Sequence, residues 1–251
     1  MLTTGGSRRL TVAAWTGALL LLVAGAAAWG AEDDRAGERE AMLETVQAHA
    51  ATATAALGAA AIEPRVLEAM RKVPRHLFVP PGQRPHAYED RPLPIGRGQT
   101  ISQPFIVALM TDLLDLGPGD TVLEVGTGSG YQAAVLAELA GRVRTIEIIP
   151  DLARTAGELL GRLYGNVEAR AGDGYHGWPE AAPFDTIVVT AAASHVPPPL
   201  VRQLRPGGRV VIPVGGRFSV QQLVLVEKDG AGRVTTRQLL PVAFVPLTGG
   251  G

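Results

Sequence analysis

Gly126, Gly128 and Gly130 mark a glycine turn between a short, mostly apolar strand and a helix-like segment. Because glycine has no Cβ atom, the backbone of such a turn can approach a ligand closely, and the start of the helix favours polar ligand groups. The spacing is one residue shorter than the G-x-G-x-x-G turn of dinucleotide-binding proteins. It therefore favours a nucleoside ligand without a pyrophosphate and disfavours an NAD-dependent dehydrogenase.

Strand-like and helix-like segments alternate along the chain from this region onward. We predict strands at 121–125, 143–148, 167–171, 186–190 and 210–214, and helices at 131–140, 151–164 and 199–204. This alternation is typical of a parallel sheet that is covered by helices on both faces. Two further runs, 222–227 and 234–240, flank a turn-rich segment and predict a hairpin at the sheet edge. The predicted fold class is α/β, with a doubly wound, mostly parallel sheet and an antiparallel edge hairpin.

The segments before the sheet are less regular. Residues 38–57 have loosely helical apolar spacing, and the Ala-rich stretch 50–61 fits either a helix or a slack linker. We interpret that stretch as a solvated helix without a catalytic role. A short helix is predicted to begin at Pro64 and to stop before Pro74. The five prolines between residues 79 and 94 predict an extended loop without regular structure.

Acidic residues lie at or near the ends of three successive predicted strands. Glu124 lies two residues before the glycine turn, and Glu147 closes the next strand. A carboxylate at this second position can accept both hydroxyl groups of a ribose. Asp173 lies between two glycines after the third strand, where it suits an exocyclic amine. Since ligands of such sheets bind at the carboxyl ends of the strands, the three signals together predict a nucleoside site.

Each of these residues also has a purely structural interpretation. Glu124 could cap the following turn, and Glu147 could pair with Arg144 on the surface. Gly172 and Gly174 could serve a tight turn. We favour the ligand-binding interpretation because all three signals fall in successive strand and helix units.

The first 30 residues differ in character from the rest of the chain. They contain no acidic residue, carry Arg8 and Arg9, and continue as an almost uninterrupted apolar run to Trp29. This order is typical of an export signal, with cleavage predicted after Gly30, whereas an uncleaved segment would be a single membrane anchor. We therefore expect an exported, periplasmic protein, which meets a membrane only if the segment is retained. The location would be cytoplasmic if the signal is not used.

Composition excludes several classes of protein. The 251 residues include 23 Lys and Arg and 24 Asp and Glu, so the net charge of −1 fits neither a polybasic nucleic-acid binder nor an acidic disordered tail. The absence of cysteine excludes disulfides, thiolate zinc sites and a cysteine nucleophile. The five histidines lack metal-ligand spacing, so we expect no metal. The length predicts one domain, or one domain plus a small appendage, and we expect a monomer.

Several separated motifs carry a family resemblance. Together, 124–132, 172–174 and 182–185 resemble the S-adenosylmethionine-dependent methyltransferase fold. Four more motifs resemble the protein-L-isoaspartate O-methyltransferase family, at 73–79, 94–104, 204–208 and 244–248. The match runs from about Ile62 to Thr248. It implies a Rossmann-like class I methyltransferase domain at 62–251, after a signal or anchor at 1–30 and a helical, Ala-rich extension at 31–61.

The resemblance implies methyl transfer from the cofactor S-adenosylmethionine to the α-carboxyl group of L-isoaspartyl residues in damaged proteins. The methyl ester formed in this family closes spontaneously to a succinimide, which reopens partly as normal aspartate. The implied partners are isoaspartyl-containing proteins and peptides, without nucleic acid. Two alternatives keep the same fold: a methyltransferase of a small molecule, and an exported binding protein without catalysis.

The resemblance also implies roles for individual residues. The glycine turn would lie against the methionine part of the cofactor, Glu147 at the ribose, and Asp173 at the adenine. The full implied cofactor set is Gln99, Thr100, Ile101, Ser102, Glu124, Gly126, Gly128, Gly130, Glu147, Asp173, Gly174 and Thr248. Ser102 is the implied active-site serine, for which we predict an orienting role toward the substrate carboxylate. A simple helix cap before Pro104 is its alternative role, and the absence of a G-x-S-x-G motif disfavours a hydrolase.

Overall fold

The computed structural model of the chain describes residues 1, 35–57, 62–216 and 219–249. Within these residues, a seven-stranded sheet has the order β5-β4-β3-β6-β7-β8-β9, and β1 and β2 form a separate antiparallel pair. The strands are β1 (Leu93–Gly96), β2 (Gln99–Ile101), β3 (Thr121–Val125), β4 (Arg142–Glu147), β5 (Val167–Ala171), β6 (Phe184–Val189), β7 (Leu204–Val214), β8 (Gln221–Lys228) and β9 (Val234–Val242). The α-helices are α1 (Ala36–Leu57), α2 (Pro64–Lys72), α3 (Pro104–Leu114), α4 (Tyr131–Ala137), α5 (Pro150–Leu163) and α6 (Pro198–Gln203). Short 3₁₀ helices are η1 (Arg75–Phe78), η2 (Pro81–His86), η3 (Gly174–His176) and η4 (Pro179–Ala181).

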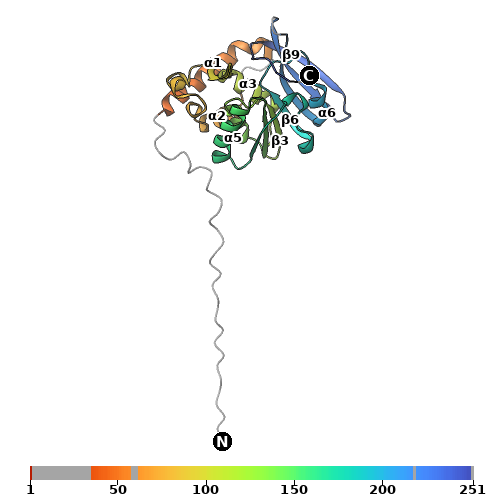
Figure 1. Cartoon of the computed structure of the whole chain (residues 1–251), viewed down its shortest axis with the longest axis horizontal. Helices are drawn as coiled ribbons and strands as arrows, with labels where there is room; N and C mark the ends of the chain where they lie inside the picture. The colour runs from red at the N-terminus through yellow and green to blue at the C-terminus, as the bar shows by residue number, and fades with distance from the viewer. Residues whose placement is uncertain (2–34, 58–61, 217–218, 250–251) are drawn as a thin grey trace. The chain divides into compact units, whose positions relative to one another are not determined.

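The predicted fold class is confirmed. Strands β5, β4, β3, β6 and β7 are parallel, and β8 and β9 continue the sheet as an antiparallel hairpin at its edge. Figure 1 shows helices α2 and α5 on one side of the sheet and α6 on the other. The structure is therefore doubly wound, as the alternation of segments predicts.

The central strand β3 positions the candidate site. It pairs in parallel with β4 on one side and with β6 on the other, and Val125 lies opposite both Ile146 and Val189. The carboxyl ends of the three strands therefore lie side by side, where strand order switches direction and ligands of such sheets bind. Val125 and Leu123 are at most 1% exposed. Because burial of each such side chain contributes roughly 1.5–3 kcal/mol, β3 is a firm base for the glycine turn.

The prediction of an extended loop without regular structure at 79–94 is wrong. Pro81–His86 form η2, and β1 begins at Leu93. Proline fits the first turn of a helix because its φ is already helical and its missing N–H group has no partner there. Helix α3, which the sequence patterns above do not predict, likewise begins at Pro104.

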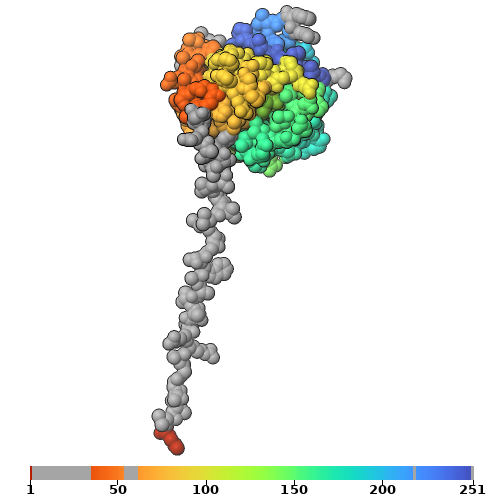
Figure 2. All heavy atoms as spheres, turned by 60° about the vertical axis from the view of Figure 1, so that its left-hand side comes forward, coloured from red at the N-terminus to blue at the C-terminus, as the bar shows by residue number. Residues whose placement is uncertain are grey.

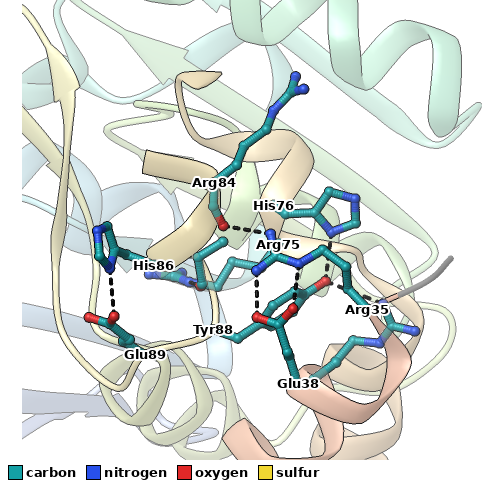
Figure 3. A network of polar contacts seen from close by, with 10 residues as sticks. Arg35, Glu38, Arg75, His76, Arg84, His86, Tyr88 and Glu89 are labelled. Atoms are coloured by element: carbon teal, nitrogen blue, oxygen red, sulfur yellow. Dashed lines mark hydrogen bonds and ion pairs between the residues drawn. The ribbon is translucent and has the colours of Figure 1, made fainter. Parts of the chain in front are cut away.

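Helix α1 packs onto the sheet domain. Its buried side chains are Met42, Leu43, Val46 and Ala50, with Arg39 also largely covered. The helix contacts α2, α3 and β9, and in Figure 2 its orange surface adjoins the golden surface of the segment that follows α2. Arg35 donates hydrogen bonds to Glu38 and to the carbonyl oxygen of Arg84, as Figure 3 shows. Residues 36–57 are therefore not merely a solvated extension, while 58–61 lie outside the described residues.

The predicted export segment at 1–30 lies outside the described residues, apart from Met1. Among the helices that the structure describes, none combines the length and the apolar character that a membrane span needs.

Candidate functional site

A pocket opens at the carboxyl ends of β3, β4 and β6. Its empty volume, open mouth included, is about 770 Å³. The predicted cofactor-binding residues that line it are Gln99, Thr100, Ile101, Ser102, Glu124, Gly126, Gly128, Glu147, Gly174 and Thr248. The structure thus brings together β2 and the residue after it, the ends of β3, β4 and β5, and the C-terminal segment.

The glycine turn surrounds one side of the pocket with backbone. Gly126, Gly128 and Gly130 have φ angles of 97°, 54° and 91°, which residues with a side chain rarely adopt. The amide of Gly126 donates to the carbonyl oxygen of Ile146 at 2.8 Å, which ties the turn to β4. A Cβ atom at Gly126 would lie 2.4 Å from Thr190 Oγ1. Position 126 therefore needs glycine for both its conformation and its space.

Glu147 closes β4 and is 6% exposed. Its Oε2 accepts a hydrogen bond from the amide of Gly128 at 2.8 Å, and its Oε1 accepts one from the amide of Ile149 at 2.9 Å. Because a carboxylate oxygen can accept two hydrogen bonds, both oxygens can still bind hydroxyl groups in the pocket. Arg144 pairs with Glu168, so the alternative pairing of Glu147 with Arg144 is not observed.

Glu124 is fully buried beneath the glycine turn. Its Oε2 accepts a hydrogen bond from the hydroxyl of Thr145, which in turn contacts the hydroxyl of Thr127. Its Oε1 is buried without a close hydrogen bond, and the backbone amide of Ala133 in α4 lies near enough to favour the charged carboxylate. Glu124 is also among the residues that line the pocket, and a buried acceptor of this kind normally has a donor. Burial raises the pKa of Glu124 to about 8.

The raised pKa makes stability depend on pH. Between the ordinary value of 4.5 and about 8, the folded protein retains a proton on Glu124 that the unfolded chain releases. The free energy of unfolding of the ligand-free protein should therefore fall by a few kcal/mol as pH rises through this window. The Glu124→Gln variant should lack this component and gain stability relative to the parent above pH 8. Denaturant unfolding at a series of pH values checks this, and parallel curves for the two proteins would contradict it.

Two predicted cofactor residues, Gly130 and Asp173, do not line this pocket. A Cβ atom at Gly130 would lie 3.1 Å from the side chain of Leu160, so this glycine allows α4 and α5 to approach closely. Asp173 caps η3, because its Oδ1 accepts a hydrogen bond from the amide of Tyr175 at 2.9 Å. The carboxylate also lies against the backbone of Gly249. Both residues make these structural contacts, and their roles toward the cofactor stay predictions.

Ser102 lies between β2 and α3. The N-cap residue of α3 is Gln103, without a side-chain capping bond, so Ser102 does not cap this helix. The carbonyl oxygen of Ser102 accepts a hydrogen bond from Arg75 Nη2 at 2.7 Å. Arg75 is 0% exposed, and its Nε donates to the carbonyl oxygen of Ala87 at 2.8 Å. This buried cation, which also lies 4.8 Å from the centre of the Tyr131 ring, fixes the loop that carries Ser102.

Sequence reasoning missed several residues of the pocket. Thr190 follows β6, and its hydroxyl donates a hydrogen bond to the carbonyl oxygen of Gly126 at 2.5 Å. Ile148 is 38% exposed and presents apolar surface beside Glu147. Both positions directly follow a strand that pairs with β3, and placement beside the end of β3 was the signal that could have found them.

A second cavity adjoins the pocket, with an empty volume of about 1070 Å³, open mouth included. Thr100, Ser102, Thr190 and Val245 line both cavities. We call this second cavity the groove, and its other walls come from α1, the start of α3 and residues 240–244. Ser102 therefore lies at the boundary between the pocket and the groove.

A family model described as Protein-L-isoaspartate(D-aspartate) O-methyltransferase matches residues 55–251. The chain belongs to the protein-L-isoaspartate O-methyltransferase family. Protein-L-isoaspartate O-methyltransferase 2 of Syntrophobacter fumaroxidans is 61% identical over 245 residues, which cover 97% of this chain and 99% of the relative.

Two solved structures of protein-L-isoaspartate O-methyltransferases are also similar. One has a TM-score of 0.72 and 29% identity, and the match covers 84% of this chain and 66% of that longer chain. The other, from Plasmodium falciparum, is described in complex with S-adenosyl-L-homocysteine. It has a TM-score of 0.69 and 25% identity, and the match covers 84% of this chain and 98% of that one.

Proposed function

We propose that the pocket holds S-adenosylmethionine and that the adjoining groove holds an isoaspartyl peptide. The chain is a protein-L-isoaspartate O-methyltransferase, which methylates the α-carboxyl group of L-isoaspartyl residues in damaged proteins with S-adenosylmethionine as methyl donor. The observation that carries the proposed arrangement is the wall shared by the two cavities at Thr100, Ser102, Thr190 and Val245. Methyl donor and acceptor have to meet at such a boundary.

The donor groups around the pocket fit this cofactor. The oxygens of Glu147 would accept hydrogen bonds from the ribose hydroxyls, and the buried carboxylate of Glu124 would complement the charge of the ammonium group. Ile148 offers apolar surface to the adenine. The backbone at Gly126 and Gly128 leaves room for the methionine part. When bound, S-adenosylmethionine would supply a sulfonium methyl group, whose carbon a nucleophile can attack while the neutral thioether leaves.

The proposed methyl transfer requires little acid–base catalysis from the side chains. A substrate carboxylate is already ionised near neutral pH, so it needs no strong general base. The chain has to align the two reactants and exclude water, and alignment of this kind can supply roughly 7–11 kcal/mol. Ser102 lies where its hydroxyl can donate a hydrogen bond to the carboxylate and orient it.

Replacement of Ser102 by alanine should lower kcat about 10- to 100-fold, because one orienting hydrogen bond to the carboxylate is lost. The affinity for S-adenosylmethionine should change little. Initial rates and calorimetric titration of the cofactor measure the two effects. Ser219→Ala, in the exposed turn after β7, is the control and should retain full turnover. Unchanged turnover in the Ser102 variant would contradict the orienting role.

The function is tested by incubating the full chain with labelled S-adenosylmethionine and an L-isoaspartyl peptide. The expected result is base-labile methyl incorporation, which is absent with the matched aspartyl peptide. If the chain binds the cofactor but methylates neither peptide, the proposed substrate is wrong.

We also propose that residues 1–30 direct export to the periplasm and that the enzyme acts as a monomer. The support for export is the order of charge and apolar residues in that segment. Fusion of residues 1–40 to a reporter, followed by cell fractionation, tests the location, and retention in the cytoplasm would contradict it.

A further inference from the structure

Helix α1 contributes a side chain to the groove beside Ser102. His49 lines this groove together with residues 240–245, and α1 contacts both α3 and β9. The family model matches only from residue 55, so His49 lies outside the matched range. Of the residues that line the groove in the described part of the chain, His49 alone has an ionisable imidazole, carboxyl, amine or guanidinium group.

The ring of His49 is held in place on two sides. It stacks on Phe105 with the ring centres 4.2 Å apart and the planes 15° apart. Its Nδ1 lies 2.9 Å from Asp90 Oδ2, which also accepts a hydrogen bond from Gln103 Nε2 at 3.0 Å. Asp90 Oδ1 accepts a hydrogen bond from the amide of Phe105 at 2.9 Å. Asp90 is therefore tied to the start of α3, and it fixes the imidazole relative to the Ser102 loop.

The other ring nitrogen is available to a ligand. The polar contacts of the ring with the described residues are at Nδ1, which donates to Asp90 and lies 3.4 Å from Gln103 Nε2. The side chain of His49 is 43% exposed, and it lines the groove. A ring that is already oriented loses little conformational freedom when it binds. Nε2 is thus a preorganised hydrogen-bonding atom at the side of the groove.

We infer that His49 is a substrate-binding residue, whose Nε2 holds the peptide backbone next to the isoaspartyl residue. This inference rests on the proposed function of the groove. A peptide unit presents both an N–H and a C=O group, so it can pair with Nε2 whether or not that nitrogen carries a proton. Recognition of backbone also suits a repair enzyme, because damaged residues occur in many different sequences.

The test compares His49→Ala and His49→Gln in the full chain, with isoaspartyl peptides whose flanking residues are neutral, acidic or basic. For His49→Ala, the KM for every peptide should rise roughly three- to tenfold, as expected for one lost hydrogen bond. The kcat and the KM for S-adenosylmethionine should stay within about twofold. His49→Gln should recover part of the peptide affinity, because its amide can also bond to backbone.

The matched control is His86→Ala. His86 is 47% exposed and its Nδ1 lies 2.6 Å from Glu89, as Figure 3 shows, but it does not line the groove. This variant should have parental kinetics. Thermal unfolding of all variants separates folding defects from binding defects.

The outcomes are distinct. Peptide KM values that are unchanged in His49→Ala would overturn the inference, and so would a fall in kcat alone. A rise confined to acid-flanked peptides would overturn backbone recognition in favour of charge recognition. If the parent chain methylates no isoaspartyl peptide, the proposed function fails, and this inference fails with it.

Discussion

Replacement of Gly126 by alanine should weaken S-adenosylmethionine binding at least about tenfold while the sheet remains folded. The φ angle of 97° costs an alanine of the order of 1–3 kcal/mol, and its Cβ would lie 2.4 Å from Thr190 Oγ1. The turn has to shift to relieve this contact, and it lines the cofactor pocket. Calorimetric titration gives the dissociation constant, and thermal unfolding confirms that the variant is folded.

Two further variants distinguish the effect of backbone strain at a positive φ angle from the effect of the steric clash with Thr190. Gly232 has a φ of 83° in the β8–β9 hairpin, and a Cβ atom there would meet nothing within 4 Å. Gly232→Ala should therefore lose some stability but no cofactor affinity. The double variant Gly126→Ala with Thr190→Ala removes the colliding hydroxyl and should regain part of the affinity. Parental affinity in the single Gly126 variant would contradict the close approach of the turn to Thr190.

The second large effect is expected at Arg75. Leucine at this position should reduce the free energy of unfolding by about 3–5 kcal/mol, because the carbonyl oxygens of Ala87 and Ser102 lose their buried donor. It should also lower kcat, since the Ser102 loop is no longer fixed. Burial lowers the pKa of Arg75 to about 10, which still leaves the side chain charged near neutral pH. Denaturant unfolding and peptide kinetics measure the two effects.

Arg75→Lys should have an intermediate effect. An ammonium group keeps the charge, but it lacks the planar fork that serves two carbonyl groups and lies over the Tyr131 ring. Arg71→Leu is the control, because Arg71 is exposed and pairs with Glu40 and Glu68 on the surface. That substitution should cost no more than about 1 kcal/mol. A similarly small cost for Arg75→Leu would show that the buried bonds do not stabilise the loop.

Local sequence patterns predict the part of the site that lies on successive strands. The alternation of strands and helices gives the sheet, and the register of β3 and β4 then brings Glu147 to the amide of Gly128. Composition and spacing indicate that glycine is required in the turn. They do not indicate what each missing Cβ atom would face, which depends on the packing of Leu160 and Thr190.

The rest of the site depends on contacts between distant segments. A charged residue such as Arg75 is expected at the surface, and only the fold around it shows that it is buried against Ser102. His49 lies in a helix whose alanine content suggests a solvated element, whereas its partners Asp90 and Phe105 are far along the chain. Periodicity within one segment carries no information about such pairings.

The C-terminal segment determines when the cofactor pocket can be completed during synthesis of the chain. The amide of Leu247 donates to Ala192, Ala192 donates to Val245, and the neighbouring Thr248 lines the cofactor pocket. Gly130 leaves the ribosome 118 residues before Thr248, which corresponds to about 6–24 s at typical rates of translation. During that interval the nascent chain contains the glycine turn without its final wall. The cofactor pocket can therefore be completed only after the segment that carries Thr248 has been synthesised and has packed against Ala192.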